Sequence, residues 1–234
     1  MVRYADSYLA LRHDPNHVLG YGLMRRTRQL MKACAPYVQS HPGTLQVVDF
    51  GCADGHMLSE VAAAFPERRF RLVGLDRFQN GVPEVPAGLD MRLLRVDLFS
   101  LQPLPIAAGE TDIIIASAFV KHHPRTADLL KEAHRLLKPG GIMVMLDPRP
   151  WVVHVGRMLS HFSRQFTPSI WSARSIRTTL RDSMPGAFDV RSFEHYWIAP
   201  KNQPCFPTLE DDTPAFLRLF TSLHQSMVLA KSER

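Results

Sequence analysis

A short stretch near residue 50 combines the residue types that bind a nucleotide-like ligand. The sequence VVDFGCADGH, residues 47–56, places an apolar run before Asp49 and then small residues at Gly51, Ala53 and Gly55. Small residues let the backbone turn sharply and approach a ligand closely, and a helix that starts after such a loop presents unpaired N–H groups with a partial positive charge. The pattern predicts a ligand-binding loop between a strand and a helix.

The spacing around this loop argues against a dinucleotide. The fingerprint G-x-G-x-x-G needs a small residue where the chain has His56, and it requires no acid two residues before the first glycine. Asp76 ends the next apolar run, where a carboxylate can accept both ribose hydroxyls of an adenosine. Asp97 follows the run after that. It can accept a hydrogen bond from an adenine amino group, or it can simply cap its own loop.

Alternating apolar runs and helical patterns must position these residues. Five short runs bounded by turn residues predict buried strands: Leu45–Phe50, Phe70–Asp76, Met91–Val96, Asp112–Ala116 and Ile142–Asp147. Helical patterns are predicted at Val18–Val38, which we expect to lie across the carboxyl edge of the sheet, at His56–Phe65, and at Thr126–Leu137, which ends at a helix stop, Lys138–Gly141. Strand–helix–strand repetition gives an α/β fold, a doubly wound parallel sheet with helices on both faces.

The carboxyl-terminal part continues this alternation. A helix is expected to start at Ser172, a strand to cover Phe188–Ile198, a helix to lie near Pro214–His224, and a last strand at Ser226–Lys231 to return antiparallel.

Several motifs together resemble the class I S-adenosylmethionine-dependent methyltransferases, in particular their small-molecule branch. VVDFGCADG is similar to motif I of that family, D-x-G-x-G-x-G, with Ala53 in place of the middle glycine. GLD ending at Asp76 matches the family's ribose acid, and RVDLFSL matches its adenine-edge Asp. DIIIASAFVKHHP matches its fourth-strand segment and LLKPGGIMVMLDP its helix and fifth strand, so the resemblance covers residues 45–148.

The resemblance implies a fold, a cofactor and a set of site residues. The fold is a Rossmann-like seven-stranded sheet of order 3-2-1-4-5-7-6, with strand seven antiparallel, in three α/β/α layers. The cofactor is S-adenosyl-L-methionine, with S-adenosyl-L-homocysteine as product and no metal. The expected cofactor-binding residues are Asp49, Gly51, Cys52, Ala53, Gly55, Asp76, Arg77, Asp97, Leu98 and Ser117. We expect residues 1–44 to form a helical cap or lid and residues 45–234 the methyltransferase domain, with residues 149–181 as a basic helical insert near the substrate.

Histidines after the fourth strand are the candidates for acid–base chemistry. A sulfonium methyl is already an activated electrophile, so the main task of the protein is to align acceptor and methyl. If the acceptor is a hydroxyl, a base must take its proton, and a histidine suits that role near neutral pH. His122 aligns with the second histidine of the family's fourth-strand segment and is the first candidate, followed by His123. Lys121, His195 and Tyr196 are weaker candidates.

The positive charge of the chain is concentrated in one segment. The formal net charge is +6, and residues 121–182 hold eleven Lys and Arg against four Asp and Glu. Within it, residues 151–162 place an apolar stripe opposite His154, Arg157 and His161. Such a helix can pack over the substrate pocket, contact a membrane surface, or bind an anionic, lipid-like substrate. Nucleic acid is disfavoured because no aromatic-basic recognition module is present.

Composition sets the remaining expectations. At 234 residues and 45% apolar residues, the chain can bury one core. Charges at the start of the sequence, the lack of a long apolar run and three widely spaced cysteines predict a soluble cytoplasmic protein. The leading hypothesis is an S-adenosylmethionine-dependent methyltransferase that acts on a small or lipid-like acceptor, with oxygen as the expected site of methylation. The alternatives are an RNA methyltransferase and a non-catalytic cofactor-binding scaffold, while an NAD-dependent oxidoreductase conflicts with the loop spacing.

Overall fold

The computed structural model describes residues 18–77, 84–100, 103–150, 171–196 and 224–233, with the side chains of the first helix described from Leu23 onward. Its elements in chain order are α2 (Val18–Ser40), β1 (Thr44–Phe50), α3 (His56–Ala64), β2 (Arg69–Asp76), β3 (Met91–Arg95), β4 (Thr111–Ser117), the 3-10 helix η1 (Val120–His122), α4 (Thr126–Leu136), β5 (Leu137–Pro148), α6 (Ala173–Ser183), β6 (Phe188–Tyr196) and β7 (His224–Lys231).

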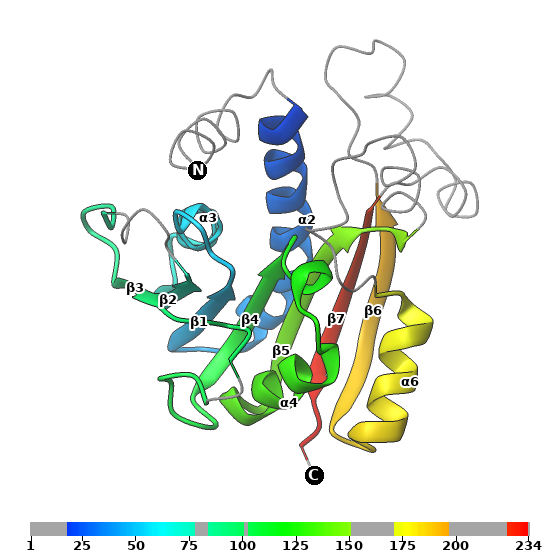
Figure 1. The fold of residues 1–234 in the computed structure, drawn as a ribbon. Coiled ribbons are helices and arrows are strands. Elements are labelled where there is room, and N and C mark those ends of the chain that lie inside the picture. The colour runs from blue at the N-terminus through cyan, green and yellow to red at the C-terminus, as the bar shows by residue number, and fades with distance from the viewer. Residues whose placement is uncertain (1–17, 78–83, 101–102, 151–170, 197–223, 234) are drawn as a thin grey trace.

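The strands form one sheet in the order β3-β2-β1-β4-β5-β7-β6 (Figure 1). Strands β1 to β5 pair in parallel, and β7 is antiparallel to both β5 and β6. The predicted strand order and the antiparallel last strand are therefore confirmed. Because β7 runs in the opposite direction, its first residue, His224, pairs with Pro148 and Tyr196 at the ends of β5 and β6. The carboxyl ends of β4, β5 and β6 and the start of β7 thus meet at one edge.

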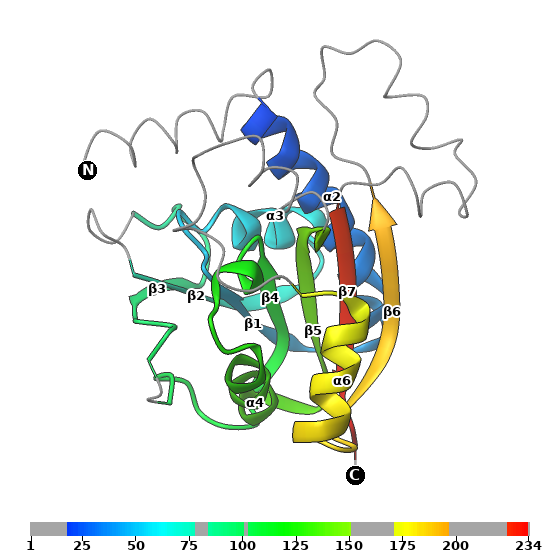
Figure 2. The same ribbon diagram turned by 45° about the vertical axis from the view of Figure 1, so that its right-hand side comes forward.

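Helices cover both faces of the sheet, as the sequence predicted. Figure 2 shows α4 and α6 in front of the sheet and α2 behind it. Side chains of one strand alternate between the two faces. Ile113 and Ile115 belong to the apolar cluster under α2 and α3, whereas Ile114 belongs to the cluster under α4 and α6. Both faces are buried, which explains the continuous apolar runs in the sequence.

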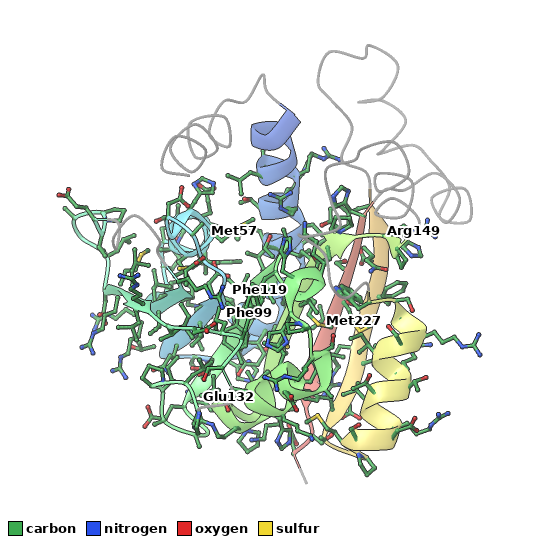
Figure 3. All side chains as sticks on the ribbon, viewed as in Figure 1. Met57, Phe99, Phe119, Glu132, Arg149 and Met227 are labelled. Carbon is green, nitrogen blue, oxygen red and sulfur yellow. The ribbon has the colours of Figure 1, made fainter. Side chains whose placement is uncertain are left out.

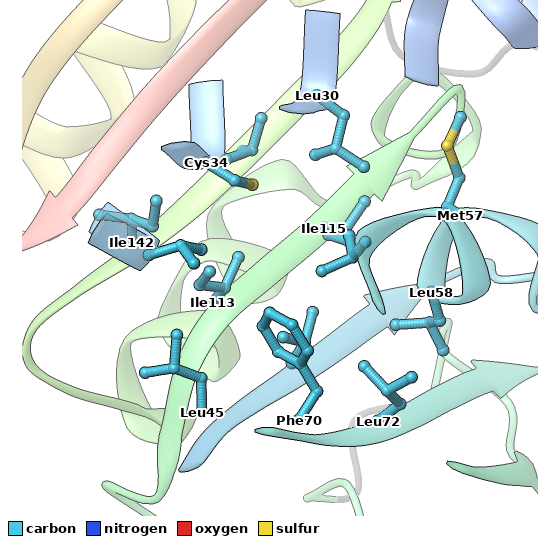
Figure 4. Packing of buried hydrophobic residues seen from close by; sticks show 14 of the residues in the cluster. Leu30, Cys34, Leu45, Met57, Leu58, Phe70, Leu72, Ile113, Ile115 and Ile142 are labelled. Carbon is cyan, nitrogen blue, oxygen red and sulfur yellow. The ribbon is translucent and has the colours of Figure 1, made fainter. Parts of the chain in front are cut away.

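The cluster on the α2 and α3 side joins the helices to the centre of the sheet (Figure 4). Leu30 and Cys34 of α2 and Leu58 of α3 are fully buried there with Ile113 of β4. The predicted helix Val18–Val38 therefore packs along a face of the sheet. The expectation that it lies across the carboxyl edge is wrong, because its apolar stripe is buried against the strands. A lid function for residues 1–44 stays a prediction.

Strand β5 begins earlier than the sequence predicted. The predicted helix stop, Lys138–Gly141, does end α4, but the chain continues directly as a strand, and Leu137 pairs with Thr111. The register shifts between Thr111 and Ile113. A Cβ on Gly141 would lie 3.0 Å from the carbonyl oxygen of Lys138, so a larger residue here would crowd the backbone.

Two predicted helices lie outside the described residues. These are the amphipathic stretch 151–162 of the basic insert and the helix near Pro214–His224, apart from His224 itself, which is the first residue of β7. Of that insert, the structure describes residues 149–150 and 171–181, and the predicted helix start at Ser172 is confirmed by α6.

Candidate active site

The loop between β1 and α3 alternates between ordinary and left-handed backbone. Gly51, Ala53 and Gly55 have φ angles of +75°, +52° and +79°. An alanine pays a steric cost in the left-handed region, so Ala53 holds a locally strained conformation. A Cβ on Gly51 would lie 2.5 Å from Cδ2 of Phe119, which excludes any larger residue there without rearrangement. The predicted small residues are therefore required by the loop geometry.

Asp76 at the end of β2 closes this loop. Its Oδ2 accepts a hydrogen bond of 2.9 Å from the N–H of Ala53, which compensates the strained residue, and its Oδ1 accepts from the N–H of Arg77 at 2.6 Å. Each carboxylate oxygen can accept a further hydrogen bond. Asp76 thus shapes the loop and retains the capacity to accept two hydroxyl groups, as the predicted ribose contact requires.

The amide groups of the loop are already used inside the protein. The N–H groups of Gly51 and Cys52 donate to the carbonyl oxygen of Leu75, and that of Gly55 donates to Cys52. The N–H of Ala53 donates to Asp76. A phosphate-binding loop needs amides that point at its ligand. This geometry agrees with the spacing argument against a dinucleotide.

Asp97 lies after β3, and one of its two carboxylate oxygens already accepts hydrogen bonds from the protein. Its Oδ1 accepts from the Arg77 guanidinium at 2.8 Å and from the N–H of Phe99 at 3.0 Å. The amide hydrogen bond, followed by the guanidinium contact, lowers the pKa of Asp97. Within the described ranges, no hydrogen bond reaches Oδ2. Asp97 therefore both caps its loop and keeps an acceptor atom for an amino group, so the two interpretations of the sequence are compatible.

Aromatic rings surround the end of β4. Figure 3 shows Phe99 and Phe119 close together, and their stacked rings lie 6.1 Å apart. The guanidinium of Arg77 lies 4.6 Å from the Phe99 ring centroid. At the end of β4, Ser117 has a buried Oγ that makes no hydrogen bond with the part of the chain that the structure describes. The predicted residues Arg77, Asp97 and Ser117 thus lie at the carboxyl ends of β2, β3 and β4, and the rings of Phe99 and Phe119 form an apolar surface at this edge.

His123 is held by the backbone at both ring nitrogens. Its Nε2 lies 3.1 Å from the carbonyl oxygen of Leu98, and its Nδ1 accepts from the N–H of Arg125 at 3.2 Å. These partners select the neutral form with the proton on Nε2. Burial lowers the pKa of His123 further. Its geometry therefore favours a role in fixing the Leu98 loop over the predicted role of base, because neither nitrogen is left to accept a proton from a ligand.

His122 is half-buried in η1, directly after β4. This places the ring near the carboxyl edge, where the sequence predicted it. Its role as a base stays a prediction.

Cys52, in the loop, and Asp49, in β1 just before it, are buried residues that anchor the loop to the sheet. Both are buried, and Asp49 lies at the register position between Gly74 and Ile115. Burial, followed by the charges of Asp49 and Asp76, raises the pKa of the Cys52 thiol. The thiol stays protonated and is unsuited to nucleophilic chemistry.

A second polar group lies at the same edge, beyond β4. Asp147 near the end of β5 is fully buried, and its Oδ2 accepts from Trp171 Nε1 at 2.8 Å and from the N–H of Lys121 at 3.3 Å. Burial raises the pKa of Asp147 to about 6, although the charges of Lys121 and Arg26 oppose the shift. The Tyr196 and His224 rings are 5.7 Å apart beside it.

Sequence reasoning did not single out Asp147, Arg26 or His224. The signal for Asp147 was present, since it ends a predicted strand as Asp76 does. Arg26 and His224 come from elements that meet only in the fold. Lys121 and Tyr196, weaker candidates from the sequence, both lie near Asp147.

Two properties of the described residues limit the chemistry. Within the described ranges no three His, Cys, Asp or Glu side chains gather as a metal site would require. The helices of the described part are all too short or too polar to cross a membrane.

Comparison with known proteins identifies the family. A family model described as a methyltransferase domain matches residues 22–185. The chain belongs to the methyltransferase domain family. The sequence resemblance is thereby confirmed, and membership of this family makes S-adenosylmethionine the cofactor, with S-adenosylhomocysteine as its product.

Curated relatives are similar over part of their length. The chain is 30% identical over 129 residues to a trans-aconitate 2-methyltransferase of Azoarcus sp., covering 55% of this chain and 47% of the relative. It is 29% identical over 169 residues to a ubiquinone/menaquinone biosynthesis C-methyltransferase of Syntrophotalea carbinolica, covering 69% and 68%. A dimethylglycine N-methyltransferase of Parasynechococcus marenigrum is 27% identical, with 61% and 50% covered. The chain thus spans about half of two of these relatives.

The fold is shared with solved methyltransferases. An S-adenosylmethionine-dependent methyltransferase from Mesorhizobium loti matches 85% of this chain and 98% of its own, with a TM-score of 0.57 and 17% identity. At this identity the likeness shows the fold alone, and it agrees with the strand order described above.

Proposed function

We propose that this protein is an enzyme that transfers the methyl group of S-adenosylmethionine to a small-molecule acceptor. The observation that carries the proposal is the loop at residues 51–55 and its closure by Asp76. This loop has a carboxylate beside it and amides already satisfied, so it suits a ligand with a ribose and no phosphates. Family membership supports the same donor.

The residues at the carboxyl ends of β1, β2, β3 and β4 bind and orient the cofactor. S-adenosylmethionine supplies a methyl group that is an electrophile once bound. Asp76 accepts hydrogen bonds from the ribose hydroxyls, and Oδ2 of Asp97 accepts one from the adenine amino group. The stacked rings of Phe99 and Phe119 form an apolar surface near these acids. Gly51, Cys52, Ala53, Gly55, Leu98 and Ser117 complete this half of the site, with Asp49 beneath it.

The acceptor lies toward η1 and β5, and the reaction is methylation at oxygen. His122 takes the proton of the acceptor hydroxyl, since it follows β4 at the carboxyl edge, next to the loop. The relatives differ in the atom they methylate, since one is named a C-methyltransferase and another an N-methyltransferase. A lipid-like acceptor and membrane contact through residues 151–162 are part of the same proposal, on the basic amphipathic pattern of that stretch.

Direct binding tests the cofactor assignment. Calorimetry with S-adenosylhomocysteine should give saturable binding of one ligand per chain, whereas adenosine diphosphate should not compete. Mass spectrometry of small molecules released from the purified protein should find the same ligand. Absence of S-adenosylhomocysteine binding would refute the proposal.

Turnover tests the role of His122 and separates the alternatives. A radiolabelled methyl donor is offered with a carboxylic acid, a quinol, an amine and a short RNA as acceptors. His122→Ala should lower turnover of a hydroxyl acceptor at least tenfold and leave cofactor affinity within twofold, while full-speed turnover would remove His122 from the mechanism. Labelled RNA, together with binding that weakens steeply with salt, would instead favour an RNA methyltransferase. Cofactor binding with no labelled product from any acceptor would favour a scaffold.

A further inference from the structure

Two successive carbonyl groups after β3 accept hydrogen bonds from the segment that follows β4. His123 Nε2 donates to the carbonyl oxygen of Leu98 at 3.1 Å, and Arg125 Nη2 donates to that of Phe99 at 3.1 Å. The Nδ1 of His123 accepts in turn from the N–H of Arg125 at 3.2 Å. His123 and Leu98 are 25 residues apart in the sequence. Polar contacts thus join two segments that the sequence separates.

One peptide group carries this contact to Asp97. The peptide between Leu98 and Phe99 is planar and trans, so its C=O and N–H groups point in opposite directions. His123 holds the carbonyl oxygen, and the N–H donates to Asp97 Oδ1 at 3.0 Å. Hydrogen bonds in such a chain strengthen one another. His123 therefore fixes the orientation of the N–H group that holds the Asp97 carboxylate.

The donors on Oδ1 direct the other oxygen of Asp97 toward a ligand. Besides the N–H of Phe99, the Nε and Nη2 atoms of Arg77 donate to Oδ1 at 3.0 and 2.8 Å. In the part of the chain that the structure describes, Oδ2 accepts no hydrogen bond. The side chain is half-exposed, so a ligand can reach this atom. An ionised carboxylate only accepts hydrogen bonds, and it therefore favours an amino group over a carbonyl group.

His123 is also tied to the 3-10 helix after β4. It directly follows η1, which contains His122, and its N–H donates to the carbonyl oxygen of Val120 at 3.0 Å. Its buried ring packs edge-on against Phe99 and Phe119, with ring centroids 5.4 and 6.2 Å apart. The ring is thus fixed by both packing and hydrogen bonds, and it sets the position of the segment after β3 relative to η1.

We propose that His123 is a positioning residue for recognition of the purine base of the cofactor. It holds the peptide group of residues 98–99 so that Asp97 presents Oδ2 to the 6-amino group of adenine, and it thereby sets the base specificity of the site. The proposal rests on the proposed function, because it concerns the same cofactor and the same carboxylate. In this role His123 acts through Asp97 and takes no proton from the acceptor.

Paired calorimetry with two ligands tests this assignment. S-adenosylhomocysteine has an amino group at position 6 of the purine, whereas S-inosylhomocysteine has an oxo group there. The two ligands share their charge, ribose and amino-acid part, so the ratio of their dissociation constants reports on the contact at position 6. The parent should bind S-adenosylhomocysteine at least about tenfold more tightly. A purely structural loss would weaken both ligands and leave this ratio unchanged.

Asp97→Asn tests whether Asp97 faces position 6. Three donors surround the place of Oδ1, so the amide oxygen must occupy it and the amide nitrogen replaces Oδ2. That nitrogen donates to an oxo group. The variant should therefore bind S-inosylhomocysteine at least as tightly as S-adenosylhomocysteine, and a preference like that of the parent would overturn the proposal.

Two substitutions of His123 separate the contacts of its ring. Asparagine keeps an acceptor in the place of Nδ1 for the N–H of Arg125 but loses the donor to Leu98, whereas glutamine keeps a donor in the place of Nε2. His123→Asn should lower the ratio at least about fivefold, and His123→Gln should stay within about twofold of the parent. An unchanged ratio in His123→Asn, or an equal loss in both variants, would overturn the proposal.

If His123→Asn does not fold, Arg125→Met decides. The Arg125 side chain is 43% exposed, so its truncation should be tolerated, but the carbonyl oxygen of Phe99 loses its donor. The ratio should fall about threefold. Lys131→Met, at an exposed lysine of α4, is the matched control and should keep the ratio of the parent. Equal ratios in Arg125→Met and Lys131→Met would overturn the proposal.

The outcomes separate the two proposals. No binding of S-adenosylhomocysteine refutes the proposed function. Equal affinity of the parent for S-adenosylhomocysteine and S-inosylhomocysteine refutes the positioning role of His123 and leaves the function standing.

Discussion

Single residues of the cofactor loop carry two separable constraints. Gly51 has a left-handed φ of +75°, and a Cβ there would lie 2.5 Å from Phe119, whereas Gly186 has a similar φ of +72° and open space around it. Gly186→Ala therefore measures the backbone cost alone, about 1 kcal/mol. Gly51→Ala should lose about 1–3 kcal/mol more in urea unfolding, because overpacking adds to the backbone cost. Equal losses in the two variants would show that Phe119 moves aside freely.

Asp76 is expected to act on cofactor affinity through charged hydrogen bonds. Asp76→Ala should weaken S-adenosylhomocysteine binding by about 1.5–3 kcal/mol, measured by calorimetry. Asp189→Ala, at an exposed position of β6, is the matched control and should leave the affinity unchanged. If Asp76→Ala also binds with unchanged affinity, Asp76 has no ribose contact.

Asp147 should make stability depend on pH in an unusual direction. Its pKa is about 6 in the folded chain, where burial raises it from 3.8. Between pH 4 and 6 the folded state holds a proton that the unfolded state has lost, so the free energy of unfolding falls as pH rises, by about 3 kcal/mol in total. Asp147→Asn removes this proton exchange. Urea unfolding at pH 4.5, 5.5 and 7 should show the difference between parent and variant changing by about 2 kcal/mol over this range, and a constant difference would contradict the shifted pKa.

At the scale of elements, most of the sheet was predictable because both faces are buried. A continuous apolar run such as IIIA in β4 is typical of a strand that is buried on both faces. The loop after β1 was predictable from its small residues. The early start of β5 was not, because it depends on the pairing of Leu137 with Thr111, which lies far from it in the sequence. The packing of α2 on a face of the sheet depends on long-range contacts that no local pattern contains.

The start of α6 links an element to the site. Ser172 Oγ accepts from the N–H of Ser175 at 3.1 Å, and Ser175 Oγ accepts in turn from the N–H of Ser172 at 2.7 Å. This capping box fixes the helix directly after Trp171, which holds Asp147. Ser172→Ala should cost about 1 kcal/mol in urea unfolding, against less than about 0.3 kcal/mol for Ser183→Ala at the end of the helix. A cost no larger than that of the control would mean that the cap is redundant.

At the scale of the whole molecule, one sheet carries two halves: the cofactor half, which contains β1 to β4, and the acceptor half, which contains β5 to β7. The apolar cluster under α2 and α3 runs from Leu72 of β2 to Val228 of β7, so the two halves should unfold together. S-adenosylhomocysteine at a hundredfold excess over its dissociation constant should stabilise the chain by about 2.7 kcal/mol. Hydrogen exchange should detect this gain also in the β5–β7 pairing, which includes Met145 and Met227. Protection confined to residues 45–100 would contradict a single cooperative unit. Adenosine diphosphate is the control. It should protect neither half, because the amides of the loop are already hydrogen-bonded within the protein.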